Sequence, residues 1–229
     1  GTDVIPALAE SYEANAELTE YTFKMRQGVT FHNGATLDAN DVVATYASYW
    51  DAASPNHVGR TGSFEYFGAF FGGPINAETV DSELVDTDGL LSIKAASCDY
   101  GGEFAGIEAV DAMTVKFSLC YPDPAFPSKV AFSVFSILDR EHLDLTKGDS
   151  VAISDNPNGT GPFTVKQWNR GDSVVYEAFD GYWGEKAKTP NLIFRWSEQS
   201  AQRLLELQSG NVQGIDNPGP DDIATIEAD

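Results

Sequence analysis

The sequence predicts an α/β protein in which a mixed α+β lobe is followed by part of a more regular α/β lobe. Alternating apolar and polar residues mark several strands in the first half of the chain. An apolar stripe at helical spacing runs from Val42 to Trp50 among these strands. Near the end, a strand, a helix and a second strand follow one another over 192–215, an order typical of a parallel pair joined by a right-handed crossover.

Composition and charge narrow the function classes. The 229 residues are 42% hydrophobic and 12% aromatic, which is enough for a real core. Fourteen Lys and Arg against 35 Asp and Glu give a net charge of -21, so nucleic acid and anionic membrane surfaces are excluded as partners. Such acidity suits an extracellular or high-salt environment, and an ordinary solvated surface is the alternative.

No stretch of the sequence predicts a membrane-spanning helix or a leader peptide. A spanning helix needs about 18 or more consecutive apolar residues, and no such run occurs. The sequence begins at Gly1 with neither Met nor an apolar leader, so a signal peptide, where the protein has one, lies outside it.

The first elements are two extended segments, 8–13 and 20–25, separated by a polar turn. Asp38 is placed to cap the following helix, with Asp41 in its first turn, where a carboxylate faces the positive end of the helix dipole. The periodicity predicts that this helix buries one stripe. Residues 51–92 are rich in Gly and Pro and predict loops and short helices.

The acidic run from Asp81 to Asp88 invites comparison with a calcium site. An EF-hand loop needs ligands at alternating positions, a central Gly and a final Glu, and this run lacks that pattern. We therefore expect a solvated acidic loop.

The next predicted strands cover 93–97, 107–110 and 113–120, the last with one apolar face. Cys98 and Cys120 flank a predicted hairpin and are the two cysteines of the chain, a pattern that indicates a disulfide formed in an oxidising compartment. Two unrelated buried thiols are the alternative. A short helix is expected from Asp139 onward.

The segment 156–183 lies between the two predicted lobes. It begins with a tight turn, Gly159-Thr160-Gly161-Pro162, and continues as a hairpin over 163–178. Gly161 precedes a proline in the tight turn between the two lobes. We therefore expect another part of the backbone close to Gly161, or an unusual backbone angle at it, with an ordinary turn as the alternative. On this expectation Gly161→Val would cost about 1 to 3 kcal/mol.

Beyond the hairpin, we expect a strand at 192–196, a helix at 197–209 ended by Gly210, and a strand at 212–215. Ligands bind at the carboxyl ends of strands in such units, which here means Asp216 to Pro220.

Signatures of catalysis are missing from the sequence. It contains no nucleophile elbow, zinc-protease motif, phosphate loop or dinucleotide fingerprint. The three histidines, His32, His57 and His142, are scattered. The family resemblance described below implies a structural role for His32, with metal binding as the alternative. The sequence therefore predicts no enzyme, no cofactor and no metal site.

Three stretches carry a resemblance to a known family. The run GTGPF with Trp168, the Arg170-Gly171-Asp172 turn and Gly181-Tyr182-Trp183-Gly184 is similar to the signature of the family 5 extracellular solute-binding proteins. The runs IPALAESYE with YTFKMRQGVTFHNGATLDANDVVATY, and RLLELQSGNVQGIDN, match in the family's order. The resemblance implies an incomplete type II periplasmic-binding-protein-like architecture, with a small flanking lobe at 1–155 and a partial binding lobe at 156–229.

The resemblance also implies a function. Members of the family are the peptide, dipeptide and nickel receptors of bacterial ABC importers, so the expected partners are a peptide-like ligand and a membrane permease. The expected state is a periplasmic or extracellular monomer, lipid-anchored in some full-length members. A receptor for nickel or another small ligand, and a non-transport interaction protein that reuses the fold, are the alternatives.

The resemblance suggests few ligand contacts. The Asn-x-x-Pro segment matches Asn217 to Pro220, which makes Asn217 and Gly219 the candidates for lining the cleft. Asn56 follows Ser54-Pro55, where the oligopeptide receptors carry an aromatic residue, and it departs from that pattern.

Overall fold

The computed structural model describes residues 3–58, 65–73 and 84–227. The chain divides into two compact units, which are described separately below. The large unit comprises Gly1–Thr164 and Phe179–Lys186, and the small unit comprises Val165–Ala178 and Ala187–Asp229. The lobe boundary expected between 155 and 156 stays a prediction.

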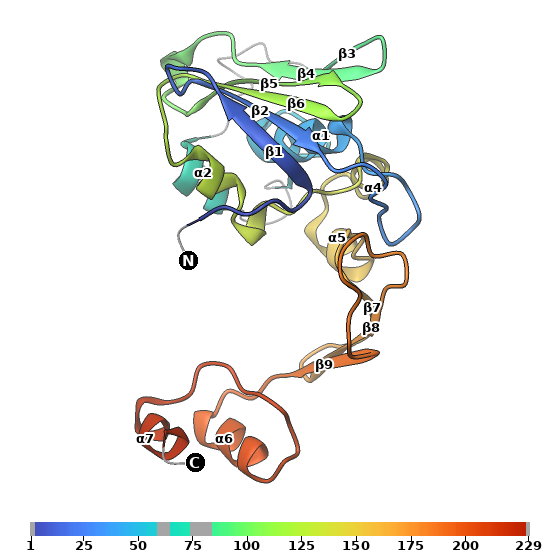
Figure 1. Cartoon of the computed structure of the whole chain (residues 1–229), viewed down its shortest axis with the longest axis vertical. Coiled ribbons are helices and arrows are strands. Elements are labelled where there is room, and N and C mark those ends of the chain that lie inside the picture. Colours follow the sequence, from blue (N-terminus) through green and yellow to red (C-terminus); the bar gives the residue numbers. More distant parts are fainter. Residues whose placement is uncertain (1–2, 59–64, 74–83, 228–229) are drawn as a thin grey trace. The chain divides into compact units, whose positions relative to one another are not determined.

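An antiparallel sheet forms one layer of the large unit (Figure 1). Its strand order is β1-β2-β6-β5-β4-β3, and all the neighbouring pairs run antiparallel. The bounds are β1 Ala9–Ala14, β2 Glu20–Met25, β3 Val85–Thr87, β4 Leu90–Lys94, β5 Phe104–Asp111 and β6 Thr114–Leu119.

The hairpin of β3 and β4 corrects the expectation of loops over 51–92. Asp88 and Gly89 both have positive φ, at 55° and 83°, which is the geometry of a tight two-residue hairpin turn. The Asp86 carboxylate accepts a hydrogen bond of 2.8 Å from the Gly89 amide and closes the turn. Residues 81–83 of the expected acidic loop lie outside the described residues, and the part that follows is the exposed strand β3.

Helix α1, Ala39–Trp50, forms the centre of the large unit. Its start is the predicted one, because the Asp38 side chain accepts from the Asn40 and Asp41 amides while Asp41 accepts from the Asp38 amide. The expectation of a single buried stripe is wrong, since all twelve residues of the helix are buried. The Tyr46 ring contacts Phe117 of the sheet and Phe135, and the Thr45 hydroxyl accepts from the Leu138 amide at 2.9 Å, so α1 packs against the sheet and against later segments of the chain.

Short helices surround this core. Their bounds are α2 Glu65–Phe71, α3 Phe126–Val130, α4 Arg140–Thr146 and α5 Ser150–Asp155, with the 3-10 turns η2 Cys98–Tyr100 and η3 Ser133–Phe135. The short helix expected from Asp139 is α4, and the Asp139 side chain caps it by accepting from the amides of Glu141 and His142. The disulfide is also confirmed: Cys98 in η2 and Cys120 after β6 are bonded, with their Cα atoms 5.5 Å apart.

The small unit contains a three-stranded sheet and two helices. The sheet order is β7-β8-β9, with β7 Phe163–Asn169 beginning in the large unit, β8 Ser173–Ala178 and β9 Asn191–Arg195. The helices are α6 Ser200–Gln208 and α7 Ile223–Ile226, the latter preceded by the 3-10 turn η4 Pro220–Asp222. Val174 is the sole buried hydrophobic residue among those described in this unit.

The predicted strand at 212–215 is wrong, and with it the parallel crossover. Gly210, with φ at 74°, ends α6 as expected. The amides of Asn211 and Val212 then donate back to the Glu206 carbonyl at 2.9 and 3.3 Å. Because the helix end takes these donors, the segment begins as a helix cap rather than as a strand.

Candidate functional site

Hydrogen bonds and a ring contact in the large unit hold the segment 158–161, called the crossing segment below, against the turn at His32. The His32 amide donates to the Gly159 carbonyl at 2.9 Å, and its ring Nε2 lies 3.0 Å from the Gly161 carbonyl. Since a carbonyl only accepts, Nε2 carries the ring proton. The ring also lies edge-on to Phe179, with the centroids 4.9 Å apart. These contacts support the predicted structural role of His32.

The geometry at Gly161 differs from what the sequence predicted. A Cβ built on it has no neighbour within 4 Å, and its φ is outside the left-handed region. The expectation of close approach or an unusual backbone angle is therefore wrong. The carbonyl oxygen of Gly161 accepts the hydrogen bond from His32, and a side chain at this position would leave that oxygen in place.

Three carboxylates lie together at the start of α4. Oxygens of Asp41, Asp139 and Glu141 are within 4.8 Å of one another, which makes them the candidate metal ligands of the described residues. The two buried carboxylates are already used: Asp41 accepts from the amides of Asp38 and Arg140, at 2.8 and 2.9 Å. Asp139 accepts from the Asn33 and Asn158 side chains at 2.7 and 2.8 Å, besides capping α4.

This arrangement is a structural junction. Burial raises the pKa of Asp41 to about 6, with Asp38 and Asp139 adding to the shift against its backbone hydrogen bonds. Burial also pushes the pKa of Asp139 upward, but hydrogen bonds from Asn33, Glu141 and backbone amides outweigh it and hold that pKa below its usual range. The carboxylates thus join α1, α4 and the crossing segment.

Asn56 lies at a small pocket of the large unit, of about 220 Å³. Its Nδ2 donates to Asp144 Oδ1 at 2.6 Å, while its Oδ1 is buried without a hydrogen-bond partner among the described residues. The guanidinium of Arg140, which also lines the pocket, binds the neighbouring Glu141 at 3.1 Å. The pocket therefore has charged residues in its wall, and the unpaired Asn56 acceptor is buried from solvent.

Asn217 and Gly219 lie in the small unit, in the loop between α6 and η4. Asn217 has a left-handed backbone, with φ at 49°, and its side chain binds Asp216 at 3.0 Å. Arg203 of α6 holds the loop by donating to the carbonyls of Asp216 and Asn217, at 3.1 and 2.7 Å. The Gly219 amide donates to Asp222 Oδ2 at 3.0 Å. The structure thus keeps these two residues together and places Asn56 in the other unit.

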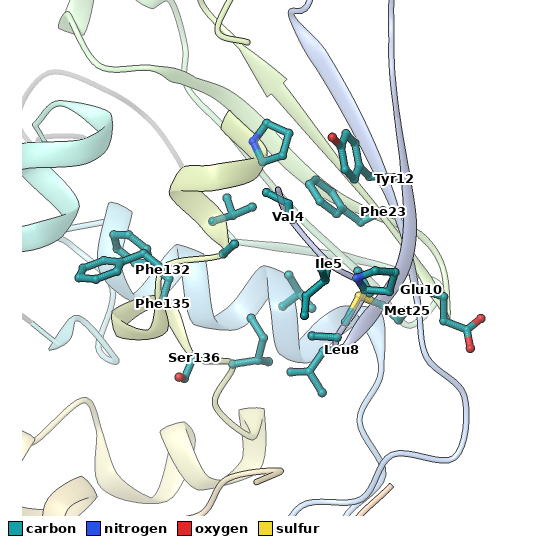
Figure 2. A pocket seen from close by; sticks show the side chains of 18 of the residues that line it. Val4, Ile5, Leu8, Glu10, Tyr12, Phe23, Met25, Phe132, Phe135 and Ser136 are labelled. Atoms are coloured by element: carbon teal, nitrogen blue, oxygen red, sulfur yellow. The ribbon is translucent and has the colours of Figure 1, made fainter. Parts of the chain in front are cut away.

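An apolar cavity of about 500 Å³ in the large unit is a feature that the sequence did not indicate. Its wall includes the labelled side chains of Figure 2, among them Val4, Ile5, Leu8, Tyr12, Phe23, Met25, Phe132 and Phe135. Val4 and Ile5 lie between Phe132 and Phe23 in this view. These residues come from distant parts of the chain, so no local sequence pattern predicts the cavity. Glu10 at its edge is paired with Arg26 at 3.5 Å.

Comparison with known proteins decides the family. Residues 3–229 match the bacterial extracellular solute-binding proteins, family 5 Middle. The chain belongs to this solute-binding family. The family consists of binding proteins rather than enzymes, and the described residues of this family 5 chain include no helix long and apolar enough to cross a membrane.

Relatives of this family 5 chain include peptide-binding proteins. It is 32% identical to a dipeptide-binding protein of Escherichia coli over 100% of its length, which is 39% of that protein. A di/tripeptide-binding protein of Pseudomonas aeruginosa is 29% identical, and heme-binding protein A of Haemophilus influenzae is 26% identical. The chain thus spans about two-fifths of the length of the relatives it matches.

Solved structures confirm the predicted fold class. HbpA2 of Haemophilus parasuis matches with a TM-score of 0.77 and 30% identity, covering 100% of this chain and 41% of that one. The periplasmic binding protein DppA of Helicobacter pylori, in complex with a peptide, matches with the same TM-score of 0.77 at 23% identity, over 99% of this chain and 40% of the other. The fold is therefore the mixed α/β fold of this part of the type II periplasmic binding proteins.

Proposed function

We propose that the chain is part of the extracytoplasmic substrate-binding component of an ABC importer, which captures a peptide-like ligand and delivers it to a membrane permease. One observation carries this proposal: the chain aligns along its whole length, at 32% identity, with a dipeptide-binding protein. Other peptide-binding relatives align in the same way. In this function the protein acts outside the cytoplasm, as a monomer, without catalysing a reaction.

The ligand contacts that we propose are Asn217 and Gly219, with Asn56 as a third candidate. The loop at 216–219 supports the first two, because Arg203 and Asp222 hold its backbone in place before any ligand arrives. Preorganised polar groups of this kind bind with a smaller entropic cost. Asn56 is supported by its place in the wall of a pocket that also has charged residues, Arg140, Glu141 and Asp144.

Haem is a second candidate ligand, because one relative is a heme-binding protein at 26% identity. A nickel complex is a third, since a solved structure of Campylobacter jejuni NikZ with Ni(L-His) shares the fold at a TM-score of 0.64. The described residues give neither candidate a preformed ligand set of histidines.

A chimaera tests the proposal. The matching segment of the Escherichia coli dipeptide-binding protein is replaced by this chain, and dipeptide binding is measured by titration calorimetry. We expect binding with a Kd near 1 μM, which corresponds to about 8 kcal/mol. Haem and Ni²⁺ with L-histidine are titrated in parallel. A chimaera that melts cooperatively and binds haem or nickel, but no dipeptide, contradicts the proposed ligand class.

Site variants of the chimaera test the contacts. Asn217→Gly removes the amide and keeps the left-handed backbone, so an effect on Kd reports the side chain. We expect a loss of about tenfold for one hydrogen bond. Asn211→Ala, in the same unit, is the matched control. Equal affinities of the two variants would remove Asn217 from the site.

A further inference from the structure

A buried acid, Glu103, and a partly buried one, Asp123, lie at the disulfide-bridged end of the large unit. Glu103 directly precedes β5, and its side chain is 0% exposed. Its backbone is held at both ends, because its amide donates to the Phe71 carbonyl and its carbonyl accepts from the Cys120 amide, each at 2.7 Å. Glu103 is therefore held in the interior, where ionisation is costly.

One ammonium group faces two carboxyl groups at this place. Lys129 of α3 puts its Nζ 2.5 Å from Glu103 Oε2 and 2.7 Å from Asp123 Oδ2. One oxygen of the pair lacks a partner: Glu103 Oε1 is buried and receives no hydrogen bond within the described structure, whereas Asp123 Oδ2 faces the Lys129 ammonium. With both carboxyl groups ionised, Glu103 Oε1 would be an unpaired acceptor close to a second anion.

A single proton on Glu103 removes this defect. Both carboxyl groups contact the same ammonium group, so one proton balances the charge of all three groups. The cluster then contains one carboxylic acid, one carboxylate and one ammonium, with no net charge. We propose that Glu103 stays protonated in the folded protein up to neutral pH, and that burying this acid makes the fold less stable as the pH rises.

The surrounding groups favour the neutral acid. Burial is the largest cause that raises the pKa of Glu103, to about 7, and Asp123 adds to it while Lys129 opposes it. Burial pushes the pKa of Asp123 upward, but hydrogen bonds from Lys129, the Ala125 amide and Glu103 outweigh it and hold that pKa below its usual range. The other titratable groups that face Glu103 are Tyr21, Tyr100 and Tyr121, whose phenol pKa values are all raised, so they stay neutral.

Lys129 connects this cluster to the five-residue helix α3. Its ammonium also lies 5.6 Å from the centre of the Phe71 ring, so α3 is attached to α2 through the same side chain. Pro127 and Val130 of α3 line the apolar cavity. The buried acid thus lies beside a helix that forms part of the cavity wall.

The sign of the pH effect follows from the direction of the shift. A carboxyl group with a raised pKa in the folded state stabilises the fold fully below its unfolded pKa and loses that contribution as the pH rises through the folded pKa. Between about pH 4.5 and pH 7, this group should lower the folding equilibrium constant roughly a hundredfold. Glu103→Gln mimics the protonated acid, so it should become more stable than the parent as the pH rises.

Urea denaturation from pH 4.5 to 8.5 tests this expectation, with the disulfide intact. Glu108→Gln on β5, the strand that Glu103 precedes, is the matched control: Lys116 lowers the pKa of Glu108, so this variant should lose most stability at neutral pH. Opposite pH trends of the two variants support the proposal. Equal trends overturn it.

A direct titration keeps the test valid even where Glu103→Gln fails to fold. The carbon-13 shift of the Glu103 carboxyl group in the parent chain reports its protonation. A midpoint between pH 6 and 8 is expected. A midpoint near the ordinary value of about 4.5 overturns the proposal.

Discussion

At the scale of single residues, polar side chains of the large unit serve chiefly to satisfy buried backbone groups. Asn40 is an example: its side chain donates to the Gly89 carbonyl and accepts from the Leu91 amide, at 3.0 and 2.9 Å, joining α1 to the β3–β4 hairpin. Asp38 and Asp139 cap helices in the same way. Such residues contribute about 1 kcal/mol each through the groups they satisfy.

Two glycines allow a sharp prediction at this scale. Gly148 has φ at 65°, and a Cβ there would lie 2.4 Å from the Asn56 carbonyl oxygen. We expect Gly148→Ala to lower the free energy of unfolding by about 1 to 3 kcal/mol. Gly161→Ala should change it by less than about 0.5 kcal/mol, because its Cβ meets open space. Urea unfolding of both variants is the measurement, and similar losses would contradict the local geometry of Gly148.

At the scale of elements, the large unit joins its sheet to its short helices through covalent and ionic links at one end. The disulfide connects η2 to the end of β6, and Lys129 connects α3 to residues flanking β5 and β6. Five-residue helices such as α3 are too short to be stable alone, so these contacts decide whether they form.

The disulfide should therefore contribute measurably to stability. Replacing Cys98 and Cys120 together by Ala opens a loop with a sequence separation of 22. We expect a loss of about 3 kcal/mol on the chain-entropy account. Thermal melting with and without reductant is the measurement. The parent should lose stability on reduction and the double variant should not change, whereas a parent that is indifferent to reductant would show that the bond contributes little.

At the scale of the whole molecule, the two units differ in how completely their apolar side chains are buried. The large unit has a continuous aromatic core, including the fully buried rings of Phe31, Phe104 and Phe126. In the small unit, Ile193 and Phe194 of β9 are 57% and 55% exposed. Apolar residues on both faces of a strand are typical of a sheet that is covered on both sides.

This difference predicts uneven protection of the backbone. Amides of the large unit should exchange slowly with solvent, and those after about residue 190 should exchange fastest, because few buried contacts hold them. For the same reason, we expect this chain alone to bind peptide weakly or not at all. Hydrogen exchange and calorimetry against a peptide library measure the two effects. Micromolar peptide binding by the chain alone would place the ligand site elsewhere.

Local features determined much of what the sequence could predict. The strand at 20–25 has the predicted bounds, because alternation and a flanking turn specify it within a few residues. The same holds for the cap at Asp38, for the short helix that starts at Asp139 and for the stop at Gly210. The motif GTGPF and its companion stretches indicated the family, since a family signature is itself a sequence pattern.

Tertiary structure alone decided the rest. The segment 212–215 has a strand-like sequence, yet its first amide is taken by the end of α6. In the sequence, nothing distinguishes Glu103 from an exposed charged residue. Only the fold shows that it is enclosed by β5, β6 and α3, beside Asp123. The apolar cavity draws its walls from distant parts of the chain. In each case the outcome depends on which groups meet in space and lose water, and sequence neighbours do not carry that information.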